Sequence, residues 1–177
     1  MALQEVHWQG AGEMMVDDHT IIWSGLPEGS VRQSGMALVL DRKATFAFKA
    51  WYPLSDRVLL AQFRYSVGLL SVVAAYAPTN EAPEDVKDTF YWTLEHAAAV
   101  AGTGGTLVCL DDFNAVPGTN RTGCSHVLGP FRSGSANDNT ERLIDFCLGA
   151  GLRIGGSWFQ RKDIHRMSWY SNDGHIR

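Results

Sequence analysis

The sequence TLVCLDDFN, residues 106–114, is a short apolar run that leads directly into two aspartates, a phenylalanine and an asparagine. A near-continuous apolar run of this length is typical of a strand covered on both faces. Asp112 and Asn114 stand two residues apart at the strand end, so their side chains point to the same side and could hold a water and a phosphate together. An Asx-type turn is the alternative interpretation. Asp111 adds a second carboxylate, and adjacent carboxylates favour protonation unless a cation is near.

Two helices are predicted, one before this strand in the sequence and one after it. Apolar residues recur at helical spacing over Val86–Ala101, with Pro83 in the expected first turn and Gly102 just past the end. The second helix is expected over Thr140–Leu148, with Asn139 as its N-cap. The residues expected on its inner side are Leu143, Ile144 and Cys147.

The first half of the chain reads as strands separated by turn residues. The predicted strands are Thr20–Trp23, Met36–Leu40, Thr45–Trp51, Val58–Phe63 and Leu69–Tyr76. Pro53 closes the third strand, and Ser66-Val67-Gly68 joins the last two as a hairpin. We therefore expect a mostly antiparallel meander. Short strands are also expected around Arg153–Ile154 and Met167–Tyr170.

The composition indicates one folded α/β domain over residues 1–177. The chain is 45% apolar and 19% charged, which is typical of a globular protein with a core to bury. No apolar stretch approaches the roughly 20 residues of a spanning helix, and the start does not resemble a signal peptide. The three cysteines lack zinc-ligand spacing. We expect a reducing, intracellular location and no membrane partner.

The formal net charge of −4 excludes a global basic field, so any binding of nucleic acid must be local. A local patch lies within Trp158–Tyr170, where aromatic and basic residues interleave in a pattern that suits a nucleic-acid strand. The alternative is a basic turn between two strands whose aromatic residues belong to the core. The candidate nucleic-acid-binding residues are Arg161, Lys162, His165, Arg166 and Trp169.

Two more polar residues stand near predicted strand ends. Glu5 follows the apolar pair Ala2–Leu3, and a carboxylate there could ligate Mg²⁺, which prefers oxygen donors. Tyr76 ends a strand just before Ala77-Pro78, and its phenol could hydrogen-bond an anionic substrate. The alternatives are an ordinary exposed glutamate and a half-buried packing tyrosine.

Six short motifs carry a resemblance to a known family. The motifs are Leu3-Gln4-Glu5, Ser55-Asp56-Arg57, Tyr76-Ala77-Pro78-Thr79, Asp111-Asp112-Phe113-Asn114-Ala115, Asn139-x-x-Arg142-Leu143-x-Asp145-Phe146 and His165-x-x-Ser168-Trp169-x-Ser171-x-Asp173-Gly174. In this order they resemble the endonuclease/exonuclease/phosphatase superfamily, and within it the endonuclease domains of non-LTR retrotransposons and the craniofacial development protein 2-like proteins. The resemblance implies an α/β fold of two packed β-sheets flanked by helices, a four-layer sandwich.

The resemblance also implies roles for individual residues. Glu5 matches the family's metal-binding glutamate, for Mg²⁺ or Mn²⁺, and Tyr76 matches the tyrosine that contacts the scissile phosphate. Asp112 and Asn114 match the pair that positions the attacking water and binds phosphate. Trp169 matches an aromatic residue near the DNA-facing edge.

The chain departs from the family pattern in three places. Asp111 stands where the family usually has glycine, and Ser168 replaces a threonine. The family's first strand should precede Leu3, and its Q-I-D and S-D-H segments should follow Arg177, so the chain looks incomplete at both termini. Neither His165 nor His175 matches the histidine of S-D-H.

These features predict a metal-dependent phosphodiesterase domain of retroelement type with DNA as substrate and a nuclear location. As a fragment, it should bind Mg²⁺ weakly and cleave DNA little or not at all. The alternative is a catalytically inactive remnant that binds nucleic acid or a protein. A third reading, a phosphatase of lipid or small-molecule phosphates, fits the block from His165 to Gly174 less well.

Overall fold

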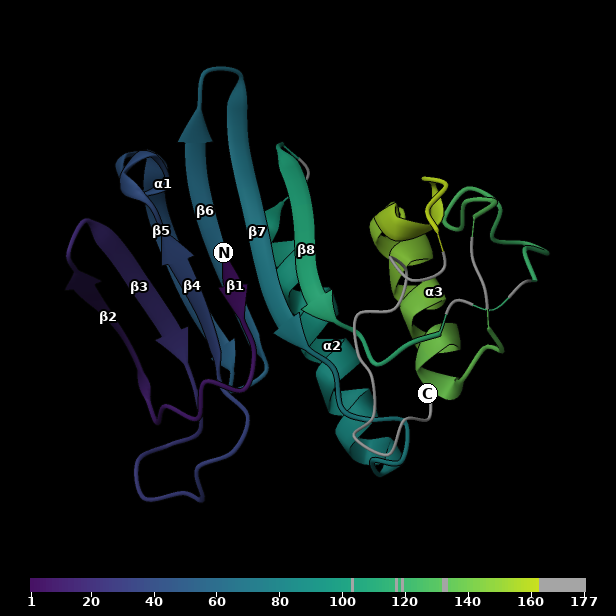
Figure 1. Ribbon diagram of the computed structural model, residues 1–177, viewed down its shortest axis with the longest axis horizontal. Helices are drawn as coiled ribbons and strands as arrows, with labels where there is room; N and C mark the ends of the chain where they lie inside the picture. The colour runs from purple at the N-terminus through teal and green to yellow at the C-terminus, as the bar shows by residue number, and fades with distance from the viewer. Residues whose placement is uncertain (103, 117, 119, 132–133, 163–177) are drawn as a thin grey trace. The chain divides into compact units, whose positions relative to one another are not determined.

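The structure, a computed structural model, describes residues 1–102, 104–116, 118, 120–131 and 134–162. It contains two compact units, Met1–Asn114 and Ala115–Arg177 (Figure 1). The first unit holds both β-sheets, and the second holds a helix with long connecting segments. Within the described residues, no helix is both long and apolar enough to cross a membrane.

The first sheet is antiparallel and has four strands in the order β1-β4-β3-β2. Its strands are β1 (Ala2–Leu3), β2 (Ala11–Val16), β3 (His19–Ser24) and β4 (Met36–Leu40). The inner face is apolar, because Ile22, Met36, Leu38 and Leu40 are all buried. This face supplies one half of the core between the sheets.

The second sheet has the order β5-β6-β7-β8 and ends in a parallel pair. Its strands are β5 (Phe48–Ser55), β6 (Val58–Tyr65), β7 (Gly68–Tyr76) and β8 (Thr106–Asp112). Parallel neighbours need a crossover connection, and α2 (Glu84–Ala101) provides it between β7 and β8. Gly102 ends this helix with a φ of 74°, in the left-handed region that favours glycine.

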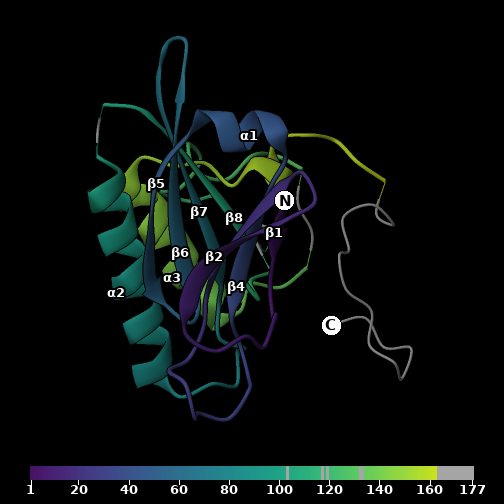
Figure 2. The same ribbon diagram turned by 90° about the vertical axis from the view of Figure 1, so that its left-hand side faces the viewer.

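Burial explains how the layers pack. Leu59, Ala61, Phe63 and Ala74 of the second sheet join the inner residues of the first sheet in one core cluster. The other face of the second sheet is covered by α2, which packs against β5, β6 and β7 (Figure 2). The buried residues of α2 on this side include Phe90, Leu94 and Ala97. The expected α/β fold with two packed sheets is confirmed.

The expected strand Thr45–Trp51 is wrong at its start. Residues Arg42–Ala47 form the short helix α1, because the Asp41 side chain accepts a hydrogen bond from the Ala44 amide (2.8 Å) and so caps a helical turn. The strand β5 then runs through Pro53 to Ser55, since an edge strand tolerates a residue without an amide hydrogen. The sequence also did not predict β2.

In the second unit, α3 runs from Asp138 to Ala150. The expected N-cap Asn139 is wrong, because Asn137 caps the helix and forms a reciprocal capping box with Thr140. Arg153–Ile154 is not a strand; the 3-10 turn η1 (Gly155–Ser157) follows it. Met167–Tyr170 lies outside the described residues.

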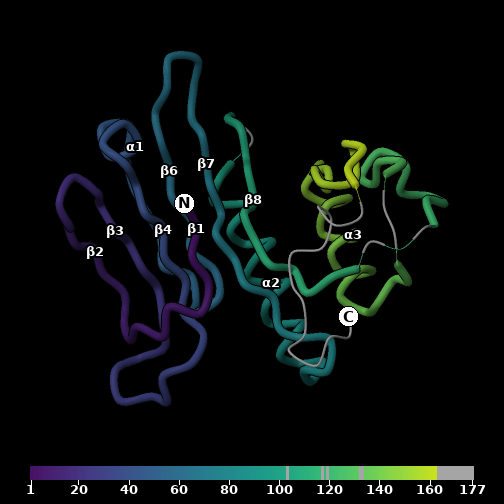
Figure 3. Tube along the Cα trace, in the orientation of Figure 1, coloured from purple at the N-terminus to yellow at the C-terminus, as the bar shows by residue number. Residues whose placement is uncertain are grey.

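Two loop segments of the second unit run side by side (Figure 3). The Ile154 amide and the Trp158 indole N–H both donate to the Val127 carbonyl, at 3.0 and 3.2 Å. The Gly129 amide donates to the Ser157 hydroxyl at 2.8 Å. These bonds hold the segment around Val127 against the turn that follows α3.

Candidate active site

Tyr76 and Glu5 meet although they come from different sheets. Tyr76 is the last residue of β7, and its hydroxyl donates a hydrogen bond to Oε1 of Glu5, which follows β1. Glu5 has a φ of 52°, an uncommon backbone conformation for a residue other than glycine. Burial and the Glu5 carboxylate raise the pKa of Tyr76 to about 12. The phenol is therefore a proton donor at neutral pH.

Asp112 lies beside Tyr76 on the neighbouring strand. The two residues are register partners in the parallel pair of β7 and β8, so their side chains share one face of the sheet. Asp112 is exposed, and its charge also raises the pKa of Tyr76. The site thus combines a phenol with two carboxylates that face solvent.

Asn114 completes a tight turn after β8. Its amide donates to Oδ1 of Asp112 (3.1 Å), which is the Asx-type geometry, and its side-chain amide donates to the Ala77 carbonyl (2.9 Å). The Ala77 amide in turn donates to the Asp112 carbonyl (3.0 Å). The φ of Asn114 is 46°, a left-handed conformation that asparagine tolerates. The turn therefore fixes Asp112 and Asn114 at the end of the β7–β8 pair.

Arg57 adds a cation to the site. It is part of the Ser55-Asp56-Arg57 motif, but no role for it follows from the sequence alone. Its guanidinium carbon lies 5.2 Å from the centre of the Tyr76 ring, and Nη1 donates to the Tyr76 carbonyl (3.3 Å). A cation stacked on a phenol stabilises both groups and could face a phosphate. The signal that could have found it is its place in Ser55-Asp56-Arg57, directly before the buried strand β6.

Asp111 does not join this group. Side chains alternate along a strand, so Asp111 points to the face opposite Asp112. Its carboxylate oxygens are buried, with no hydrogen-bond partner among the described residues. Burial, with a further contribution from the Asp112 charge, holds the pKa of Asp111 well above its usual range. Asp111 thus places a buried carboxyl on the face of the sheet opposite the candidate site.

The donor set fits a hard divalent cation that keeps much of its water. Glu5 and Asp112 offer carboxylate oxygens, the ligand type that Mg²⁺ prefers. Within the part of the chain that the structure describes, no three His, Cys, Asp or Glu side chains gather closely enough to hold a metal ion by themselves. A Mg²⁺ ion here would therefore retain several water ligands.

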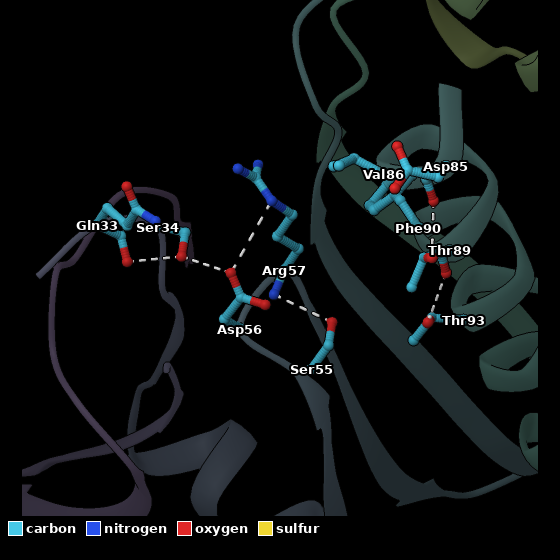
Figure 4. Close-up of a pocket in the computed structure, with 10 residues that line it drawn as sticks. All are labelled: Gln33, Ser34, Ser55, Asp56, Arg57, Asp85, Val86, Thr89, Phe90 and Thr93. Atoms are coloured by element: carbon cyan, nitrogen blue, oxygen red, sulfur yellow. Dashed lines mark hydrogen bonds and ion pairs between the residues drawn. The ribbon is translucent and has the colours of Figure 1, made fainter. Parts of the chain in front are cut away.

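A pocket adjoins the site through Arg57 (Figure 4). It has a volume of about 340 Å³ and lies between the Ser55–Arg57 turn and the first half of α2. Carboxylates of Asp56 and Asp85 and the hydroxyl of Thr89 line it. Val86 and Phe90 of α2 also line it, so its walls are mixed in polarity.

The candidate nucleic-acid patch is only partly described. Arg161 and Lys162 are exposed in the second unit, whereas His165, Arg166 and Trp169 lie outside the described residues. Trp158 is half-buried, bonded to Val127 and covered by the Arg153 guanidinium at 5.0 Å, so it anchors the loop. Phe159 is 64% exposed and could stack on a base.

Comparison with known proteins gives relatives in sequence and in structure. No family model matches the chain. The chain is 30% identical over its full 177 residues to craniofacial development protein 2 of Tragulus javanicus and of Bos taurus. It spans 30% of the first of these relatives and 29% of the second.

A solved structure shares the fold. The endonuclease domain of TRAS1, a telomere-specific non-LTR retrotransposon, superposes with a TM-score of 0.56 at 16% identity. The match covers 84% of this chain and 57% of that domain. The resemblance inferred from the motifs is thus confirmed: the chain is similar in sequence to a part of craniofacial development protein 2 and has the fold of a non-LTR retrotransposon endonuclease domain.

Proposed function

We propose that the chain is a metal-dependent phosphodiesterase domain of retroelement type that acts on DNA. One observation carries this proposal. The hydrogen bond from Tyr76 to Glu5 brings residues of two sheets together beside Asp112 and Asn114. A nuclease-type fold supports the same reaction class.

Each side chain would have a distinct task. Glu5 and Asp112 would hold Mg²⁺ or Mn²⁺, and the bound ion would neutralise charge on the scissile phosphate. On substrate binding, the Tyr76 hydroxyl would release Glu5 and donate its single hydrogen bond to a phosphate oxygen instead, because the phenol stays protonated at neutral pH. Asp112 would orient a water for in-line attack, and the Asn114 amide would bind the phosphate.

DNA is the proposed substrate, and the exposed residues of the second unit support it. Arg161 and Lys162 could contact phosphates, and Phe159 could stack on a base. His165, Arg166 and Trp169 remain proposed nucleic-acid-binding residues from the sequence. A DNA substrate would place the protein in the nucleus, where a fluorescent fusion would reveal it.

A second candidate is a non-catalytic module that binds nucleic acid or a protein. It is favoured by the small number of metal-binding side chains that gather in the described part of the chain. Exposed Arg161, Lys162 and Phe159 would serve binding without cleavage.

A plasmid-nicking assay separates the two candidates. We expect slow conversion of supercoiled to nicked DNA with Mg²⁺ or Mn²⁺, loss of nicking with a chelator, and a fall of at least ~10²-fold in Asp112→Ala. Glu95→Gln, a change at an exposed carboxylate of α2, is the control and should nick at the parent rate. DNA binding without nicking in either metal would favour the second candidate.

A further inference from the structure

Asp56 lies in the turn between β5 and β6 and contacts the other sheet. Its carboxylate oxygen Oδ2 lies 2.5 Å from the Ser34 hydroxyl, whose single hydrogen is shared between this oxygen and the Gln33 carbonyl at 2.6 Å (Figure 4). Its backbone carbonyl accepts a second bond from the Gly35 amide at 3.0 Å. Ser34 and Gly35 lead directly into β4, so Asp56 links the two sheets at one end.

The same Ser34–Gly35 segment holds the backbone that follows Glu5. The Val6 amide donates to the Gly35 carbonyl (3.2 Å), and the His7 amide donates to the Ser34 carbonyl (2.9 Å). The direction of the Glu5 side chain depends on this anchored backbone. Asp56 is therefore connected to the backbone next to Glu5 through hydrogen bonds of the Ser34–Gly35 segment.

On its other side, Asp56 reaches Tyr76 through Arg57. The Arg57 carbonyl accepts a bond from the Tyr76 amide (3.0 Å), and its guanidinium stacks on the Tyr76 ring. Nε of Arg57 lies 3.9 Å from Oδ2 of Asp56, the oxygen that also accepts from Ser34. The Tyr76 hydroxyl then bonds to Glu5 and closes a ring of contacts.

Backbone strain marks the same ring. Ser34 is buried with a φ of 54°, and Glu5 has a φ of 52°. Left-handed backbone at residues other than glycine is unfavourable and persists only where the surroundings hold it. The bond from Ser34 to Asp56 is such a restraint.

We propose that Asp56 is a positioning residue, which holds Glu5 and Tyr76 in register across the two sheets by binding Ser34 on one side and Arg57 on the other. The catalytic consequence rests on the proposed function, because only then does the Glu5–Tyr76 pair act on a phosphodiester. The positioning itself can be tested without any activity.

A thermal double-mutant cycle tests the positioning in the full 177-residue chain. Asp56→Ala and Tyr76→Phe are measured singly and together. We expect the melting-temperature loss of the double variant to fall short of the sum by roughly 1–2 °C, since both changes break one ring. Glu95→Ala, a change at an exposed carboxylate of α2, should be additive with Tyr76→Phe. If Asp56→Ala does not fold, Ser34→Ala enters the same cycle. Additivity overturns the proposal.

Nicking kinetics test the consequence for catalysis. Asp56→Ala should lower kcat roughly tenfold to a hundredfold with KM for the plasmid unchanged, as misplaced reacting groups do. Asp56→Asn keeps an acceptor for Ser34 and should recover most of the rate, and Glu95→Ala should match the parent. If Asp56→Ala leaves kcat unchanged, the positioning by Asp56 has no consequence for catalysis. If the thermal cycle shows coupling but the protein nicks no DNA, the positioning role of Asp56 stands and the proposed function is overturned.

Discussion

The Tyr76 hydroxyl donates a hydrogen bond to the Glu5 carboxylate across 71 positions of sequence. Glu5 follows the edge strand β1 of one sheet, and Tyr76 ends an inner strand of the other. Neither side chain can reach the other until the two sheets have packed. The geometry of the candidate site is therefore a product of the core between the sheets.

The first prediction concerns Tyr76→Phe. Loss of the hydroxyl should lower the free energy of unfolding by about 0.5–1 kcal/mol, the low end for a hydrogen bond, because Glu5 is exposed and water can replace the phenol. The folded-state pKa of about 12 lies above the usual value of 10.0, so this stabilisation is present at neutral pH. It should be lost as the pH rises from about 10 through about 12.

Urea unfolding at pH 7, 9 and 11 measures this difference. The difference in free energy of unfolding between the parent and Tyr76→Phe should be the same at the two lower pH values and smaller at the highest pH. Tyr52→Phe removes an exposed hydroxyl on β5 and serves as the control. A gap that widens at high pH would contradict the prediction.

The second prediction concerns Asp111→Asn, which should stabilise the protein at neutral pH. A raised pKa means that the folded state binds the proton more tightly than the unfolded state. The parent is thus most stable at acid pH and loses stability as the pH rises above the ordinary aspartate value. Asparagine has nearly the same shape and no charge, so its gain in the free energy of unfolding over the parent should be larger near pH 7.5 than at acid pH.

Thermal or urea unfolding at pH 4.5 and pH 7.5 checks this sign. The advantage of Asp111→Asn should shrink toward the lower pH. Asp145→Asn, at an exposed position of α3, should show no such trend. Equal stability of Asp111→Asn and the parent at pH 7.5 would mean that ionisation of the buried carboxyl does not destabilise the folded state.

Local signals were enough to predict most of the elements. Met36–Leu40 matches β4 because Gly35 and Asp41 bound a purely apolar run. The sequence missed α1, where one side-chain bond from Asp41 outweighs the strand propensity of Phe46 and its neighbours. Phe46 is 94% exposed, so it gains nothing from burial and does not hold the segment in a sheet. β2 (Ala11–Val16) could not be predicted, because its apolar residues do not alternate with polar ones. Most of its side chains face solvent.

The candidate site could be predicted as a set of residues but not as a geometry. Tyr76 and Asp112 each end a strand, and Glu5 follows one, which is a pattern visible in the sequence. The roles of Asp56 and Arg57 depend on contacts between distant segments. No spacing rule reports such contacts, since they are set by how the two sheets pack.

The third prediction concerns the cap of α3. Asn137 accepts bonds from the Thr140 amide (3.1 Å) and the Val116 amide (3.3 Å), so Asn137→Ala should lower the free energy of unfolding by about 1–2 kcal/mol. Asn137→Asp keeps the acceptor and should restore most of it. Circular dichroism during urea unfolding measures both variants. An alanine variant as stable as the parent would show that the cap contributes little.

The fourth prediction concerns DNA affinity. Each lysine or arginine that contacts a phosphate adds roughly 0.9 to the slope of log affinity against log salt concentration. Removing both Arg161 and Lys162 by alanine substitution should therefore reduce that slope by roughly 2 and weaken binding about equally for all sequences. Fluorescence anisotropy with a labelled duplex between about 50 and 200 mM salt, over which such binding falls by orders of magnitude, measures it. Lys49→Ala, at an exposed cation of β5, is the control, and an unchanged slope in the double variant would exclude phosphate contacts by this pair.

The two edges of the second sheet differ in their capacity to accept another strand. Pro53 leaves β5 without one amide donor, and its register shifts near both ends, so that edge is a poor template. β8 contains no proline, so each of its residues carries an amide hydrogen, and Val108 and Leu110 on one of its faces are 37% and 40% exposed. An extended segment that adds to this sheet would thus pair along β8. Because β8 ends at Asp112, such a segment would become a wall of the candidate site.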